Sequence, residues 1–260
     1  MSTRFAGLVT LAVLLVVPGT AAASPLAGYW PMYEGKGQVV HDISGNHNDG
    51  RLGSSRSTDG RDAEWVDGLL GVGDALRFDG NDYIAIPDAK SLHPQRLTVE
   101  AWAKRAGSPG SYKYIVSKGG DGCEAASYGL YSSYNGGIAF YVYDGKKWYR
   151  SPSASEKVWD GKWHHFAGTY DGKKVHLYVD GVEVGTGTAF TGKIKYDSPV
   201  GDGAIGAYRG ACKLTLSGTV DEVRIWTEAL PVGRIWSLIS SGLGREPVAP
   251  NAKQWFAGGL

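Results

Sequence analysis

The sequence predicts an all-β protein, built as a two-sheet antiparallel β-sandwich with one short helix near its C-terminus. Three observations lead to this fold class: apolar residues alternate along short segments, Asp-Gly pairs separate several segments, and glycine and tyrosine are abundant, with 39 and 15 copies in 260 residues. Alternation gives a strand two different faces, and Asp-Gly between such runs is a strong hairpin signal. The length suits one all-β domain of ~200–250 residues.

The first 23 residues are expected to be a secretory signal peptide. Arg4 supplies a positive charge, residues 8–17 form an almost wholly apolar run, and Ala21-Ala22-Ala23 is a small-residue cleavage site. The alternative, a membrane anchor, needs ~20 apolar residues, which is more than this run provides. We therefore expect a secreted, extracellular protein with no membrane span. Its domain should cover residues 24–242, followed by a poorly ordered tail at 243–260.

The charge balance favours neither nucleic acid nor an anionic membrane surface as a partner. The chain has 27 basic and 26 acidic side chains, and removing residues 1–23 takes away one arginine and leaves it formally neutral. Strong binding to polyanions normally needs an excess of basic residues. The expected partner is an extracellular glycan or protein, bound by a monomer.

The two cysteines, Cys123 and Cys212, are expected to form a disulfide bond. Export makes the bridge chemically allowed, and exported proteins rarely keep two unpaired thiols. Closing a loop of ~90 residues would stabilise the fold by roughly 4 kcal/mol in the chain-entropy model. Two free thiols are the alternative.

Two segments in the first half of the predicted domain alternate as strands do. In residues 97–104, Leu97, Val99, Ala101 and Ala103 share one face, which is the pattern of a half-buried strand. Residues 138–143 form a second such run, which ends at an Asp-Gly turn. Both segments are therefore expected to contribute to the core.

The second half contains a predicted meander, a late strand and the helix. Asp171-Gly172 and Asp180-Gly181 divide residues 163–185 into three short runs, which predicts a three-stranded meander. Residues 219–226 are rich in β-branched side chains, which suits a central strand. Residues 231–240 carry apolar residues at helical spacing, with proline in the first turn and glycine just beyond the end.

Four phrases along the chain, each a strand next to a turn or loop, carry a family resemblance. They are Asp42 to Asn46, Ala75 to Gly80, Trp163 to Phe166 leading into Leu177 to Gly181, and Gly218 to Ile225. None is specific alone, but the ordered set resembles the laminin-G-like, concanavalin A-like jelly-roll family. The resemblance implies two curved antiparallel sheets packed face to face, an extracellular setting, and recognition of glycans or other proteins. The fold alone does not assign a ligand.

The resemblance also implies one structural calcium ion at the rim of the sandwich. The matching positions are Asp42 in the first phrase and Asp221 in the last, and Asn46 would add an amide oxygen, with Glu34 a weaker candidate. Calcium takes six to eight oxygen ligands, and residues from distant strands can supply them together. The alternative is that Asp42 and Asn46 only satisfy backbone amides of a turn.

The chain lacks the catalytic patterns of related enzymes. Concanavalin-like glucanases carry Glu-x-Asp-x-Glu on one strand face, and this triplet does not occur here. Asp221 and Glu222 are adjacent in a strand, so their side chains should face opposite sides and not flank one bond. His164 and His165 should also face opposite sides, which favours one buried and one surface histidine over a metal site.

Aromatic side chains in loops and hairpins are the best candidates for sugar contacts. Trp148 and Tyr149 follow an Asp-Gly turn, Tyr208 lies beside Arg209, and arginine can add hydrogen bonds to a stacked sugar. The alternative is that these rings cover the core from its edges. We therefore expect non-catalytic recognition of an extracellular carbohydrate. A protein-binding or adhesion module is one alternative, and a glycoside hydrolase or polysaccharide lyase with unrecognised catalytic residues is another.

Overall fold

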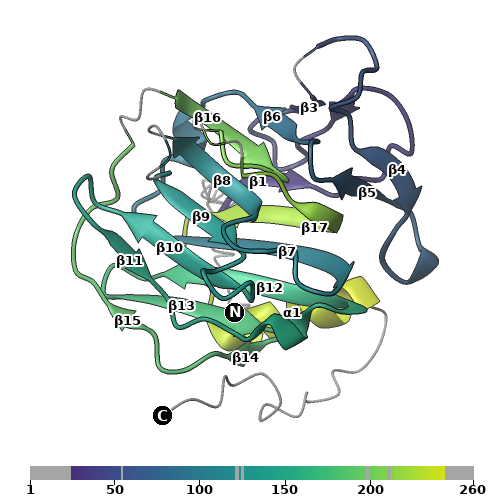
Figure 1. Ribbon diagram of the computed structural model, residues 1–260. Helices are drawn as coiled ribbons and strands as arrows, with labels where there is room; N and C mark the ends of the chain where they lie inside the picture. The colour runs from purple at the N-terminus through teal and green to yellow at the C-terminus, as the bar shows by residue number, and fades with distance from the viewer. Residues whose placement is uncertain are drawn as a thin grey trace, which may run out of the picture.

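The computed structural model describes residues 25–243, except 54, 121–122, 124–125, 197–199, 210–211 and 213. The predicted signal peptide and all but the first residue of the predicted tail lie outside the described residues. Two antiparallel sheets pack face to face, and one helix lies against the outer side of one of them (Figure 1). The predicted fold class is confirmed.

The first sheet contains nine strands among the described residues. In spatial order they are β14 (Val182–Glu183), β13 (Lys174–Val179), β12 (Asp160–Tyr170), β7 (Leu97–Ala106), β17 (Ser217–Trp226), β5 (Asp74–Asp79) and β4 (Glu64–Asp67). Two further strands join this row, β1 (Leu26–Trp30) beside β17 and β15 (Thr188–Ala189) beside β13. The predicted meander is β12, β13 and β14, and the predicted late strand, β17, lies centrally between β7 and β5.

The second sheet contains eight strands in the same described part of the chain. In spatial order they are β11 (Trp148–Arg150), β10 (Ala139–Tyr143), β9 (Tyr128–Tyr131), β8 (Tyr114–Gly120), β16 (Val200–Ile205), β6 (Ile84–Ile86), β3 (Gly50–Leu52) and β2 (Val39–Val40). Short 3-10 turns occur at η1 (Leu69–Gly71), η2 (Lys90–Leu92) and η3 (Glu156–Val158).

The main core lies between the two sheets. The four alternating residues of β7, from Leu97 to Ala103, are all buried there, as their spacing predicts. From the facing sheet, Leu130, Phe140 and Val142 pack into the same core. Because these residues alternate with others along their strands, each sheet keeps a second face that must be covered or left open.

Helix α1 (Val232–Leu243) covers the outer face of the first sheet. Its Ile235 and Ile239 pack with Trp102 of β7 and Trp226 of β17 in one buried apolar cluster. Gly181, at the β13–β14 turn, lets the helix come close, because a Cβ there would lie 2.7 Å from the Trp236 ring. Its φ of 75° also favours glycine.

Both neighbouring histidines of β12 are buried, so the expectation of a surface histidine is wrong. His164 is 6% exposed and His165 is 1% exposed. The reason is that the outer face of this sheet is not open to water: the Trp102 ring packs edge-on against His165 at 5.3 Å between ring centroids. On that covered face, Nε2 of His165 lies 3.2 Å from a carboxylate oxygen of fully buried Glu100.

Cys123 and Cys212 form the predicted disulfide, with their Cα atoms 5.1 Å apart. The bridge ties the segment after β8 to the segment after β16, two strands that are neighbours in the second sheet. We expect the Cys123→Ser, Cys212→Ser double variant to lose about 3–4 kcal/mol of stability, because the unfolded chain regains the freedom of an 89-residue separation. Urea denaturation checks this, and an unchanged midpoint would show that the bridge adds nothing.

His164 is expected to make stability depend on pH. Burial alone lowers its pKa, but hydrogen bonds and charges from Asp180 and Asp160 outweigh burial and raise the pKa above its usual value. A pKa raised on folding contributes stability below the unfolded value of ~6.5, and this contribution is lost as pH rises through the higher folded value. The stability advantage of the native protein over His164→Gln should therefore shrink as pH increases from about 6 upward. Denaturation curves of both proteins across this range would contradict the effect if their difference stayed constant.

Candidate functional site

Tyrosine side chains cover the outer face of the second sheet. On β10, Phe140 and Val142 enter the core, so Tyr141 between them points to the opposite side. Tyr114 of β8 and Tyr131 of β9 join it in a cluster separate from the main core. The Tyr131 ring lies 5.2 Å from both the Tyr114 ring and the Tyr141 ring, between centroids. The hydroxyl oxygens of Tyr114 and Tyr141 are 3.1 Å apart and share a hydrogen bond.

An open cavity of about 810 Å³ lies over this tyrosine cluster. We call it the aromatic groove and define it by its described lining residues: Tyr112, Tyr114, Cys123, Tyr131, Tyr141, Trp148, Arg150, Ser151, Pro152, Thr188 and Leu214. The floor is made of buried rings from three adjacent strands, so it is rigid. Figure 1 shows the strands β8 to β11 that carry it facing the viewer, on the side of the sandwich away from α1.

Exposed rings and one cation stand at the edges of the groove. Trp148 is 47% exposed and Tyr112 is 45% exposed, although both are large apolar side chains. The Arg150 guanidinium lies 5.3 Å above the Tyr134 ring, in cation–π contact. None of the described lining residues is an Asp or a Glu. The groove therefore offers aromatic faces, hydroxyl groups and a positive charge.

The groove tyrosines are neutral at neutral pH. Burial raises the pKa of Tyr114 well above its usual value, and the hydrogen bond with Tyr141 lowers it only in part. Burial also raises the pKa of Tyr131, although Arg150 acts in the opposite direction. A neutral phenol can donate its O–H as well as accept a hydrogen bond, so these side chains can pair with sugar hydroxyls.

The structure separates the four sequence-predicted ligand residues. Trp148 lines the aromatic groove, whereas Tyr149 faces the other way and stacks on Phe190 at 3.8 Å. Tyr208 is buried beside the groove, with its ring 5.2 Å from that of Tyr114. Arg209 lines a different hollow. Sequence reasoning passed over Tyr141, although the alternation in residues 138–143 places it opposite two core residues.

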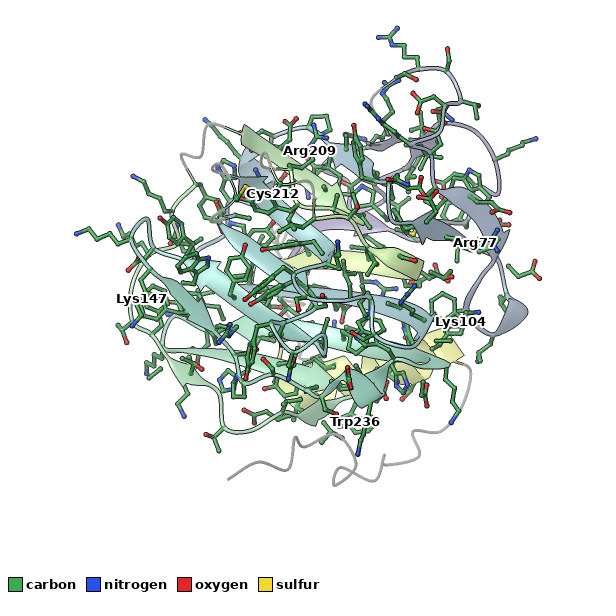
Figure 2. All side chains as sticks on the ribbon, viewed as in Figure 1. Arg77, Lys104, Lys147, Arg209, Cys212 and Trp236 are labelled. Atoms are coloured by element: carbon green, nitrogen blue, oxygen red, sulfur yellow. A yellow bond between two sulfur atoms is a disulfide. The ribbon has the colours of Figure 1, made fainter. Side chains whose placement is uncertain are left out.

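A second, smaller hollow of about 150 Å³ contains Arg209. We call it the arginine pocket and define it by its described lining residues: Arg61, Asn81, Tyr83, Ala207, Tyr208, Arg209 and Thr215. The Arg209 guanidinium lies 4.9 Å above the Tyr83 ring, and one of its nitrogens is 3.7 Å from a carboxylate oxygen of Asp202. Figure 2 labels Arg209 and Cys212 in the same region of the second sheet.

The predicted calcium ligand Asp42 acts as a turn residue in this structure. Its carboxylate accepts hydrogen bonds from the backbone amides of Tyr29, Ser44 and Asn48, at 2.8 to 2.9 Å. Asn46 lies in the same turn and donates its side-chain amide to the carbonyl oxygens of residues 26 and 27. Both side chains thus form hydrogen bonds with backbone groups, which is the role that the alternative to calcium binding gives them.

Asp221 belongs to a separate network. One of its carboxylate oxygens accepts from the backbone amide of Leu69 and the other from that of Glu222. Burial raises the pKa of Asp221 to about 7, although the Leu69 amide lowers it. The described residues contain no group of three or more His, Cys, Asp or Glu side chains arranged to hold a metal ion. Asp42 and Asn46 thus bond groups at one turn, whereas Asp221 bonds the amides of Leu69 and Glu222, and calcium binding stays a prediction.

The sequence matches the model of the concanavalin A-like lectin/glucanases superfamily over residues 78–235. The chain belongs to this superfamily. The match covers the central strands of both sheets, including all those that build the aromatic groove. No curated protein matches the chain significantly. No helix in the described part of the chain is both long and apolar enough to cross a membrane.

Similar solved structures include binding domains and parts of larger enzymes. One is domain 4 of AbnA, a GH43 extracellular arabinanase from Geobacillus stearothermophilus, in complex with arabinotriose. It is 19% identical to this chain, with a TM-score of 0.61. The match covers 82% of this chain and 98% of the arabinanase domain. The binding domain of Paraclostridial Mosquitocidal Protein 1 is 16% identical with a TM-score of 0.62, and the match covers 84% of this chain. Trypanosoma rangeli sialidase with the inhibitor DANA is 21% identical with a TM-score of 0.56, and the match covers 86% of this chain.

The chain spans 52% of the mosquitocidal binding domain and 34% of the sialidase. At these identities the likeness concerns the fold. The same sandwich thus occurs in binding domains and in chains that include enzymes, and the function must be argued from the site.

We expect Asp42→Ala to lower the free energy of unfolding by about 3 kcal/mol, because three backbone amides lose a charged acceptor. Asp67→Ala, which removes an exposed carboxylate on β4, is the matched control and should change stability little. Thermal unfolding of the native protein with and without a chelator then tests calcium separately. A melting temperature indifferent to chelator, together with an unstable Asp42→Ala variant, would show that Asp42 serves the turn alone.

Proposed function

We propose that the protein is an extracellular, non-catalytic carbohydrate-binding module whose ligand lies in the aromatic groove. The observation that carries this proposal is the floor of tyrosine rings with exposed Trp148 and Tyr112 at its edges. Aromatic faces stack on the apolar faces of sugar rings and lose little conformational entropy when they do so. The cavity volume of about 810 Å³ is within the range of ordinary ligand sites.

The polar groups of the groove fit sugar hydroxyls. Neutral tyrosine hydroxyls, the Ser151 and Thr188 hydroxyls and the Arg150 guanidinium all line it. Together they supply both donors and acceptors, and a sugar hydroxyl needs both. The shape also favours a glycan over a flat protein surface, because the groove is hollowed between strands and their loops.

The lining residues also support a binding role over hydrolysis. A glycoside hydrolase usually needs two carboxyl groups ~5–9.5 Å apart around the scissile bond, and the described lining of the groove has none. A lyase would use a tyrosine as base, but burial raises the pKa of Tyr131 even though Arg150 is close. No histidine is among the described lining residues. The groove therefore favours retention of an intact glycan.

Two further observations support an extracellular glycan ligand. The Cys123–Cys212 disulfide is a bond typical of exported proteins. Domain 4 of the arabinanase AbnA, which has this fold, is described in complex with arabinotriose. Calcium, if bound, would serve the stability of the sandwich in this proposal, because the candidate ligands are not among the lining residues of the groove.

We expect Trp148→Ala to weaken glycan binding at least tenfold, because the exposed stacking face is lost while the buried floor stays in place. Binding is measured by titration calorimetry against a panel of polysaccharides, with released reducing sugar assayed in parallel. Tyr33→Ala, which removes an aromatic ring 54% exposed and outside the groove, is the control and should bind normally. Equal losses in both variants, or release of sugar by the native protein, would count against a binding module at this groove.

A further inference from the structure

We infer that the aromatic groove and the arginine pocket form one continuous binding surface, and that its ligand is an anionic glycan whose carboxylate or sulfate group binds in the arginine pocket. This inference rests on the proposed function, because it assigns the chemistry of the glycan held by the same face of the sandwich. The two hollows adjoin, the charged residues of their described lining have one sign, and Arg209 is held ready for an anion.

The two hollows share a wall. Leu214 lines the aromatic groove and the next residue, Thr215, lines the arginine pocket. Tyr208 lines the pocket, and its ring packs against that of Tyr114 in the groove floor. The Leu214 carbonyl also accepts a hydrogen bond from the Tyr114 amide at 3.2 Å. A chain of sugar rings lying in the groove can therefore extend toward the pocket, so that a charged substituent on one ring reaches it.

The charged residues in the described lining of the two hollows are all arginines. Arg150 lines the groove, and Arg61 and Arg209 line the pocket. Among the described lining residues of both hollows there is no Asp or Glu. A concave surface with charges of one sign attracts the opposite charge, and the arginine fork matches carboxylate and sulfate oxygens well. This local excess exists although the chain as a whole is close to neutral.

Arg209 is positioned before any ligand arrives. Its guanidinium lies over the Tyr83 ring, and its contact with Asp202, at 3.7 Å, is long and partly exposed, so it neutralises the arginine only weakly. Its buried Nε–H has no hydrogen-bond partner among the described residues. The Arg209 side chain is 25% exposed, so the remaining N–H groups of its guanidinium can donate to an anion in the pocket.

The other residues of the pocket fit the same role. Arg61 lies beside Tyr83, whose backbone amide donates to the Arg61 carbonyl at 3.4 Å. Asn81 and Thr215 add polar side chains to the rim. The volume of about 150 Å³ equals about five water molecules, at ~30 Å³ each, which gives room for one charged substituent. The sugar rings themselves would stay in the groove.

The test compares matched polymers that differ in charge. The full protein is titrated with carboxymethyl cellulose against hydroxyethyl cellulose, and with dextran sulfate against dextran, so that the two pairs separate carboxylate from sulfate recognition. We expect at least one anionic polymer to bind about tenfold more tightly than its neutral partner. This advantage should shrink as salt rises from about 0.05 to about 0.5 M, because salt screens exposed charges.

Variants then assign the preference to the pocket. Arg209→Gln should remove most of the tenfold advantage for the anionic polymer and leave binding of the neutral one unchanged. Arg61→Gln should also reduce the advantage for the anionic polymer. Agreement between the two variants would show that the loss does not come from a folding defect in one of them. Arg234→Gln removes the same charge from exposed α1, on the opposite face, and should change neither affinity.

The outcomes separate this inference from the proposed function. Equal binding of charged and neutral polymers, or equal effects of Arg209→Gln and Arg234→Gln, would overturn the inference while the glycan-binding function stands. Failure of every polymer and glycan to bind would overturn both. A loss on Arg209→Gln for the anionic polymers alone, with normal Trp148-dependent binding of neutral ones, would establish the pocket as the anion subsite.

Discussion

The constraint on which this molecule depends is the alternation of side chains along β9 and β10. Each of these strands must fill the sandwich core with one set of residues, and the pleat then projects the intervening set away from the core. Phe140 and Val142 belong to the first set, and Tyr141 to the second. Because the core residues fix the register, they also fix the tyrosines. The groove is thus a consequence of the packing that holds the two sheets together.

The two outer faces of the sandwich differ, because among the described residues a helix covers one and not the other. On the first sheet, α1 and the tryptophans Trp102 and Trp226 form an apolar cluster, and beside it the buried carboxylate of Glu100 contacts both His165 and Arg224. Hydrogen bonds and charges from His165 and Arg224 keep the pKa of Glu100 low in spite of burial, which acts to raise it. This face is structural. On the second sheet no helix covers the described strands, and tyrosine rings form a surface that a ligand can reach.

Alternation and turn chemistry were sufficient to predict the sandwich, the meander and the central strand, because these signals are local. An Asp-Gly pair between two strands favours a hairpin turn, and Asp171-Gly172 and Asp180-Gly181 are two such pairs. The site was harder, because it depends on which strands are neighbours. Tyr149 was predicted to bind a ligand, but neighbouring residues of a strand face opposite sides, and it is Trp148 that faces the groove. The burial of His165 likewise depends on packing around Trp102, which no local pattern reveals.

Helix α1, the last described element, lies on the side of the sandwich opposite the groove (Figure 1). The helix and the tyrosine-lined groove are therefore on opposite faces of the domain. A label, a solid support or a fused domain attached through α1 would be held behind the sandwich, and the tyrosine-lined front would stay turned toward the medium. A support-bound form of this domain made in that way would display its tyrosine-lined face outward in every copy, with the same orientation.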